Sequence, residues 1–248
     1  MKRVELIPIF EDNYVFVIID DDTRKAVVVD PGEPAAVSAF LRENGLELSA
    51  ILLTHHHRDH VGGVQALQNS FKTTVYAPLK NKTQLPYADR FVQEGETVEA
   101  AGFSFQVMEL PGHTLGHVAY WYPEKKWLFS GDVLFGLGCG RLFEGSYEQG
   151  YESLQRIKAL PSETLVYCTH EYTETNLEFC KMLSHHDDSP ITGGDEGLEM
   201  YANELTNRRS LNLPSVPLKL FIELKVNPFL LAQGVQQFAY LRDLRNKQ

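Results

Sequence analysis

The chain has 248 residues, of which 43% are hydrophobic, and its formal net charge is −10 at pH 7. This length is enough for one large domain or for a domain with an extension. The negative charge argues against nucleic acid as a partner, because phosphate binding needs a basic face. No apolar run approaches about 18 residues, and a proline at position 8 with acidic residues at 11 and 12 does not fit a signal peptide. We therefore expect a cytoplasmic protein with no membrane span.

Strand patterns dominate the chain up to residue 169. In chain order they cover residues 4–9, 14–19, 26–29, 50–53, 103–110, 127–130 and 164–169. Helical patterns interrupt them at residues 33–44, after Gly62-Gly63, and around residues 151–159. After His170, helical periodicity covers residues 171–184, 196–209 and 235–245, with no clear strand. Periodicity alone therefore predicts a mixed α/β region followed by a helical end.

Residues 54–60 read Thr-His-His-His-Arg-Asp-His and directly follow the apolar run 50–53. Imidazole and carboxylate groups together suit zinc or a similar first-row divalent ion. In extended chain His55 and His57 point to the same side. Asp59 and His60, where the chain turns into a helix, point to a second place nearby. A solvated polar loop is the alternative, but this density of ligands behind a hydrophobic strand argues against it. The heptapeptide can therefore offer ligands to two metal ions.

Three further donors stand at later strand ends. His113 follows the pattern at 103–110, and Asp132 and His170 follow the next two strands along the chain. A glycine or another small residue beside each strand end lets the backbone approach a crowded centre. One isolated donor would be weak support. Their recurrence at successive strand ends predicts that they complete a site for two metal ions.

The order His-x-His-x-Asp-His, then single His, Asp and His residues, resembles the metallo-β-lactamase superfamily. More narrowly, residues 1–245 are similar to the glyoxalase II family, the hydroxyacylglutathione hydrolases. The narrower resemblance rests on Gly112-His113-Thr114, Gly131-Asp132-Val133-Leu134-Phe135, Gly138-Cys139-Gly140-Arg141, His170-Glu171-Tyr172-Thr173 and Asn227-Pro228-Phe229. Gly-Cys-Gly before a basic residue, together with His-Glu-Tyr, is far more specific than the metal ligands alone.

The resemblance implies an α/β fold: an αββα sandwich of two mixed sheets over residues 1–170 and a helical substrate-binding domain over residues 171–248. It also implies a metal site for each of two ions. One ion would take His55, His57 and His113, the other Asp59, His60 and His170, and Asp132 would bridge the two. Asp132 and Asp59 are expected to be catalytic as well. Zinc is expected, and iron or manganese also suits such ligands.

Thioester hydrolysis is the chemistry that such a centre favours. A water between two cations loses its proton near neutral pH, and a metal ion also polarises a carbonyl. A thiolate with a pKa of about 8.5 leaves without a dedicated general acid. The resemblance makes S-D-lactoylglutathione the expected substrate, cleaved to glutathione and D-lactate in the second step of methylglyoxal detoxification.

Two alternatives to that reaction remain. The first is another hydrolase of the same fold, with a different acyl or thiol group, or a mononuclear iron oxygenase. The intact set of Asp59, His60 and His170 argues for two metals and against the oxygenase. The second is a metal-binding or redox-partner module without hydrolysis. The basic residues on the terminal helices argue against this alternative.

Local cations are needed if an acidic chain is to bind the carboxylates of glutathione. The resemblance places Arg141, Phe143, Tyr172, Arg242 and Arg245 at positions that contact the glutathione moiety. Lysine is common at the first and last of these positions, and arginine keeps the charge while changing the geometry. Phe143 stands where a tyrosine hydroxyl often contacts substrate. For the two terminal arginines the alternative is a solvated helix end. We expect the protein to act as a monomer.

Other residues near these motifs have simpler interpretations. His56 is expected to pack or hydrogen-bond beneath the site, and His117 to support a ligand. Asp30 either orients a histidine ligand through its second nitrogen or only forms a turn. Cys168 is expected to be a buried strand cysteine in a reducing compartment. His185-His186 is expected at a solvated helix end.

Overall fold

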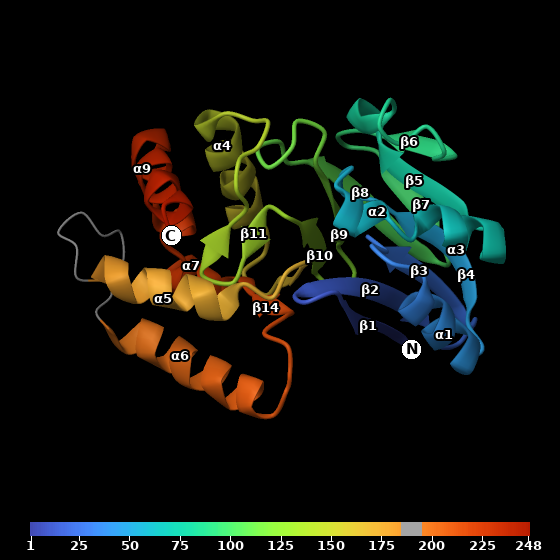
Figure 1. The fold of residues 1–248 in the computed structure, drawn as a ribbon, viewed down its shortest axis with the longest axis horizontal. Coiled ribbons are helices and arrows are strands. Elements are labelled where there is room, and N and C mark those ends of the chain that lie inside the picture. Colours follow the sequence, from blue (N-terminus) through green and yellow to red (C-terminus); the bar gives the residue numbers. More distant parts are fainter. Residues whose placement is uncertain (185–194) are drawn as a thin grey trace. The chain divides into compact units, whose positions relative to one another are not determined.

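The computed structural model describes residues 1–184 and 195–248, so the predicted helix end at His185-His186 lies outside the described residues. The chain divides into two compact units. Unit 1 comprises Met1–Glu109 and Gly116–Gly131, and unit 2 comprises Leu110–Leu115 and Asp132–Gln248. Figure 1 shows their helices and strands. The domain boundary predicted at residue 170 differs from this division into units and stays a prediction.

The first sheet of unit 1 carries the His/Asp heptapeptide at the end of its fourth strand. Its strands, in the order β1-β2-β3-β4-β5-β6, are β1 (Lys2–Ile9), β2 (Asn13–Asp20), β3 (Lys25–Val29), β4 (Glu47–Leu52), β5 (Thr74–Pro78) and β6 (Arg90–Val92). Pairing is antiparallel from β1 to β3 and parallel from β3 to β6. The apolar run predicted as a buried strand is the end of β4, which has a paired strand on each side.

Four antiparallel strands and several short helices complete unit 1. The strands run in the order β10-β9-β8-β7 and are β7 (Thr97–Ala100), β8 (Phe103–Glu109), β9 (Val118–Tyr122) and β10 (Trp127–Gly131). The helices are α1 (Ala35–Glu43), α2 (Arg58–Val61), α3 (Val64–Phe71) and the 3₁₀ turn η1 (Leu79–Asn81). The one-turn helix α2 was not predicted, because four residues are too few to show periodicity.

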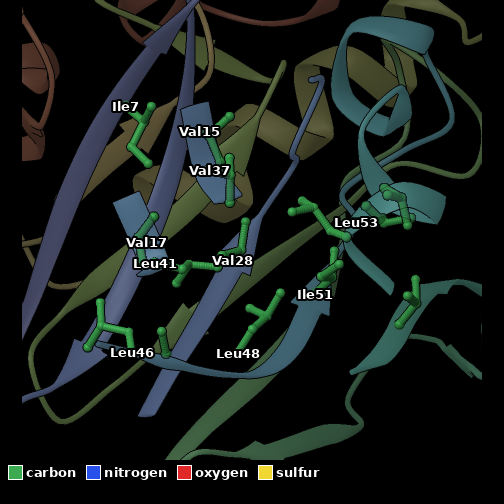
Figure 2. Close-up of a cluster of buried hydrophobic side chains, with 14 of the residues drawn as sticks. Ile7, Val15, Val17, Val28, Val37, Leu41, Leu46, Leu48, Ile51 and Leu53 are labelled. Atoms are coloured by element: carbon green, nitrogen blue, oxygen red, sulfur yellow. The ribbon is translucent and has the colours of Figure 1, made fainter. Parts of the chain in front are cut away.

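Strand β2 is buried along its whole length because both faces of its sheet are covered. Val15 and Val17 belong to an apolar cluster with Val37 and with other residues of α1 and α3, part of which Figure 2 shows. On the opposite face the Phe16 ring lies 5.8 Å from the ring of Phe129 on β10. Full burial of each such side chain contributes about 1.5–3 kcal/mol. This two-sided core gives the loop after β4 a rigid base.

Unit 2 consists mainly of helices. Its elements are β11 (Leu134–Phe135), β12 (Gly138–Cys139), α4 (Tyr147–Lys158), β13 (Leu165–Cys168), α5 (Thr173–Ser184), α6 (Asp195–Ser210), β14 (Leu218–Lys219), α7 (Leu220–Val226), α8 (Pro228–Leu231) and α9 (Val235–Asn246). Strands β11 and β12 form a hairpin, and β13 pairs with β14. Helix α5 lies beside α6, and α4 packs against α9 (Figure 1).

Three features of unit 2 differ from the predictions. Helix α4 begins at Tyr147 rather than near Tyr151, because Ser146 and Gln149 form a capping box in front of it. The expectation of no strand after His170 is wrong, since β14 pairs with β13. Helices α7 and α8 were not predicted because both are short. Among the described residues, no helix combines the length and the apolar character that crossing a bilayer requires.

Candidate metal centre

Unit 1 gathers four candidate ligands on the loop and helix α2 that follow β4. His55 and His60 are buried, and His57 and Asp59 are half-buried. The ring centroid of His55 lies 4.6 Å from that of His57 and 4.1 Å from that of His60. Nε2 of His60 lies 3.4 Å from Oδ2 of Asp59. The four donors of the heptapeptide therefore lie close enough together to bind metal.

Asp30 is a buried carboxylate that orients two of these imidazoles. Its Oδ2 lies 3.0 Å from His60 Nδ1 and accepts from the hydroxyl of Thr54 at 2.6 Å. Thr54 Oγ1 lies 3.1 Å from His55 Nδ1, and because its own proton points to Asp30, it must accept the proton of His55. Both imidazoles then present Nε2 to a metal ion. Of the two alternatives for Asp30, the structure supports orientation of a histidine.

Backbone packing brings the turn after β3 against the heptapeptide. Asp30 has a φ of 51°, in the left-handed region that Asp and Asn tolerate better than most residues. A Cβ at Gly32 would overlap the carbonyl oxygen of Asp59. The Asp30-Pro31-Gly32 turn is therefore required for the close approach that lets the Asp30 carboxylate reach His60.

Further side chains of unit 1 support the ligands. Asn13 is buried, and its Nδ2 donates a hydrogen bond to Oδ2 of Asp59 at 3.0 Å. No local pattern indicates this role of Asn13, because a single asparagine at the start of a strand has many ordinary uses. His117 stacks on His55 with ring centroids 4.9 Å apart, as a supporting residue would. His56 Nδ1 lies 3.1 Å from the side-chain amide of Asn81, in agreement with its expected hydrogen-bonding role.

Unit 2 brings together the other three candidate donors, His113, Asp132 and His170. Oδ2 of Asp132 lies 3.4 Å from Nε2 of His113 and 3.3 Å from Nε2 of His170, and all three residues are buried. Nδ1 of His113 lies 2.8 Å from the carbonyl oxygen of Arg141, so Nε2 is the nitrogen that faces the carboxylate. A Cβ at Gly140 would overlap the carbonyl oxygen of Asp132, which explains the glycine after Cys139. A carboxylate between two imidazoles suits a bridging ligand.

Two aromatic residues border these donors. The Tyr172 ring stacks on His170, with centroids 4.7 Å apart and an angle of 6° between the planes. The Phe143 side chain is 61% exposed, and its ring centroid lies 5.3 Å from that of His113. The guanidinium of Arg141 lies 5.9 Å from the centre of the Phe143 ring. Two expected substrate contacts, Arg141 and Phe143, therefore lie together beside one candidate ligand.

The two arginines of α9 are held differently from a solvated helix end. Arg242 is only 5% exposed, and its Nη1 donates to the carbonyl oxygen of Cys139 at 2.7 Å. Arg245 is half-buried, and its Nε donates to Oδ1 of Asn176 at 3.2 Å. Burial, and then the positive charges of Arg242 and Arg141, lower the pKa of Arg245. Three cations therefore lie close together in an acidic chain, which favours an anionic ligand.

Cys168 is buried at the end of β13, and burial raises the pKa of its thiol well above the ordinary value. Its Sγ faces the carbonyl oxygen of His170 at 3.9 Å. The expectation of a buried strand cysteine is confirmed.

Comparisons with known proteins cover the whole chain. The metallo-beta-lactamase superfamily matches residues 10–170, and the hydroxyacylglutathione hydrolase C-terminus matches residues 171–248. A hydroxyacylglutathione hydrolase from Bdellovibrio bacteriovorus is 66% identical over 247 residues, which covers 100% of this chain and 98% of that protein. The chain belongs to the hydroxyacylglutathione hydrolase family. The resemblance to glyoxalase II is thereby confirmed, and this family consists of thioester hydrolases.

Solved structures agree with the fold that is typical of hydroxyacylglutathione hydrolases. ETHE1 from Myxococcus xanthus has a TM-score of 0.72 at 25% identity, covering 97% of this chain and 90% of that one. TTHA1623 in a di-iron-bound form has a TM-score of 0.59 at 32% identity, covering 68% of this chain and 91% of that one. The expected metallo-β-lactamase fold, with two mixed sheets and a C-terminal helical region, is confirmed.

The donor chemistry fits the metal ions of hydroxyacylglutathione hydrolases. All seven residues of the ligand pattern are present, and the hydrogen bonds at Nδ1 of His60 and His113 leave Nε2 as the metal-binding atom. Superfamily membership together with these His and Asp residues supports a binuclear metal site.

Proposed function

We propose that this protein hydrolyses S-D-lactoylglutathione to glutathione and D-lactate, the second step of methylglyoxal detoxification. The observation that carries the proposal is the complete set of metal-binding residues, with imidazoles oriented by Asp30 and by the carbonyl of Arg141, in a chain that matches the family from end to end. Residues 1–170 are proposed as the catalytic domain and residues 171–248 as the substrate-binding domain. The meeting point of the two family matches supports this division.

The ligand assignment is part of the proposal. One ion is assigned to His55, His57 and His113, the other to Asp59, His60 and His170, with Asp132 shared between them. Zinc is the proposed metal, and iron or manganese would suit the same nitrogen and oxygen donors. Measuring the metal content of protein purified without added metal decides among the three.

The chain's own residues hold the centre ready for hydrolysis. When bound, two divalent ions would activate a water molecule as the nucleophile and polarise the thioester carbonyl. The carboxylate of Asp30, directly and through Thr54, keeps His60 and His55 in the tautomer that binds metal through Nε2. Asp132 places its carboxylate between His113 and His170. The leaving thiolate needs no acid, because its pKa is about 8.5.

Substrate selection is proposed to depend on unit 2. Arg141, Arg242 and Arg245 would receive the carboxylates of glutathione, and each charged hydrogen bond made away from water would contribute about 1.5–3 kcal/mol. The hydroxyl of Tyr172 would contact the peptide, while Phe143 would offer only an apolar surface. The protein is proposed to act on this small molecule as a cytoplasmic monomer, which size-exclusion chromatography and cell fractionation test.

Replacing the shared carboxylate tests the proposal. Asp132→Ala should abolish thioesterase activity and release at least one ion per chain, measured by S-D-lactoylglutathione hydrolysis and elemental analysis. Two tightly held ions with near-normal turnover would contradict the assignment. If the parent protein cleaves other thioesters better than S-D-lactoylglutathione, the alternative of a related thioesterase replaces the proposed substrate.

A further inference from the structure

The β11–β12 hairpin joins two parts of the candidate metal centre. It begins two positions after Asp132 and ends two positions before Arg141, whose carbonyl oxygen bonds His113 Nδ1. The backbone N–H of Gly140 donates to the carbonyl oxygen of Val133 at 3.1 Å, which closes the hairpin beside Asp132. A shift of the hairpin would therefore move both the Asp132 carboxylate and the His113 imidazole.

Five successive carbonyl oxygens of this buried hairpin accept hydrogen bonds from side chains of residues 171–248. The pairs are Phe135 O with Asn227 Nδ2 (3.2 Å), Gly136 O with Asn176 Nδ2 (3.0 Å), Leu137 O with Cys180 Sγ (3.6 Å), Gly138 O with Asn227 Nδ2 (3.1 Å) and Cys139 O with Arg242 Nη1 (2.7 Å). All residues of the hairpin are buried, so a carbonyl without such a donor would be costly.

Glu223 on α7 connects these contacts into one network. Its Oε2 accepts from the backbone N–H of Leu137 at 2.9 Å and from Nδ2 of Asn227 at 3.0 Å, and its Oε1 accepts from the hydroxyl of Tyr201 at 2.7 Å. Oδ1 of Asn227 accepts from the N–H of Phe229 at 3.1 Å. This last bond fixes the amide so that its two hydrogens face the hairpin and Glu223.

The backbone at the tip of the hairpin is strained and depends on this network. Leu137 has a φ of 57°, in the left-handed region that is unfavourable for a leucine. Its N–H is held by Glu223, its carbonyl oxygen by Cys180, and its side chain is buried in an apolar cluster with Leu177 and Leu205. Without these two hydrogen bonds the turn would relax toward an ordinary conformation.

We propose that Asn227 and Glu223 are positioning residues for the metal ligands Asp132 and His113, through the backbone of the β11–β12 hairpin. The helices that follow residue 171 thus organise the metal centre in addition to binding substrate. This inference rests on the proposed function, because it assumes that Asp132 and His113 bind metal.

Zinc affinity and steady-state kinetics of three variants test the proposal. Asn227→Ala should lower zinc affinity about tenfold, measured by chelator competition well below the melting temperature, as loss of a supporting partner does at other metal sites. Its kcat should fall with little change in KM. Glu223→Ala should behave in the same way. Glu223→Gln should recover most of the affinity, because its oxygen still accepts from Leu137 and its amide can donate to Tyr201.

A control separates positioning from general destabilisation. Leu205→Ala removes a buried side chain of the same apolar cluster without touching a hairpin carbonyl, so it should lower the melting temperature but keep the zinc affinity and kcat. If Asn227→Ala is purified folded and matches the parent in zinc affinity and kcat, the proposal is overturned. It is also overturned if Leu205→Ala loses zinc as strongly as Asn227→Ala.

Two further outcomes remain decisive. If Asn227→Ala does not fold, Tyr201→Phe replaces it, because this variant removes one hydrogen-bond donor to Glu223. A loss of zinc affinity smaller than that expected for Asn227→Ala supports the proposal, and an unchanged zinc affinity refutes it. If the parent binds two zinc ions but does not hydrolyse S-D-lactoylglutathione, the proposed function fails. In that case the zinc affinities of the variants still test whether Asn227 and Glu223 position the metal ligands.

Discussion

Asp30→Asn should act as a tautomer switch on the metal-binding histidines. Asn tolerates the left-handed φ of 51° at this position, so the backbone should stay in place. In the parent protein the backbone N–H of Thr54 donates to Oδ1 of Asp30 at 2.8 Å, and the amide oxygen of the variant would keep this hydrogen bond. The amide nitrogen would then face Nδ1 of His60 and the hydroxyl of Thr54. His60 would have to accept at Nδ1 and carry its proton on Nε2, the nitrogen needed by the metal.

The effect should reach His55 as well. Once the hydroxyl of Thr54 accepts from the new amide, its proton turns toward Nδ1 of His55, 3.1 Å away, and moves that imidazole's proton to Nε2 too. Loss of one supporting partner typically costs 10–100-fold in metal affinity, or about 1.4–2.7 kcal/mol. With two imidazoles affected, we expect a loss near the upper end of that range.

Chelator competition with zinc measures this loss, and ¹⁵N chemical shifts of the imidazoles in the metal-free protein report the tautomers. Asp89→Asn is the matched control: Asp89 also accepts from a backbone N–H, that of Val75 at 2.9 Å, and from Gln68, but from no histidine of the described residues. That control should bind zinc like the parent. Parental zinc affinity in Asp30→Asn, or unchanged imidazole shifts, would refute the tautomer argument.

Three other perturbations have expected outcomes. Asn13→Ala should weaken one of the two ions about tenfold, because Asp59 loses its buried donor; elemental analysis after dialysis checks this, and two retained ions would contradict it. Arg245→Ala should raise KM for S-D-lactoylglutathione about tenfold with little change in kcat, but leave a neutral thioester unaffected; equal effects on both substrates would count against a carboxylate contact. Burial raises the pKa of Glu223, so the folded protein favours the protonated carboxyl group. The stability that this proton contributes is fully present below the unfolded pKa of about 4.3 and is lost as pH rises through the folded pKa. In metal-free protein the melting temperature of Glu223→Gln relative to the parent should therefore increase over that window, and a constant difference would show that Glu223 does not titrate there.

The candidate ligands could be predicted from the sequence because they follow a local rule. Each stands within a few residues of the end of an apolar strand pattern, and strand ends are where a chain can direct side chains into a shared centre. His55, His60 and Asp132 need no knowledge of distant contacts to be suspected. The family resemblance then supplied their distribution between two ions.

The supporting network could not be predicted in the same way. Glu223 and Leu137 lie 86 positions apart, and nothing in the residues around either one indicates that they meet. Helices α7 and α8 are too short for periodicity to show. Arg242 was interpreted as a substrate contact, and the structure adds that it also supports the backbone at Cys139. Such partners follow from tertiary packing rather than from local pattern.

The long separation between the hairpin and its donors has a consequence for synthesis. Arg242 follows Cys139 by 103 residues, so a ribosome adding about 5–20 residues per second needs roughly 5–20 s to supply the last of the five carbonyl donors. For most of that interval the strained turn at Leu137 lacks Glu223, which follows it by 86 residues. We therefore expect Asp132 to reach its final position, and the protein to bind metal, only after most of the chain has been synthesised.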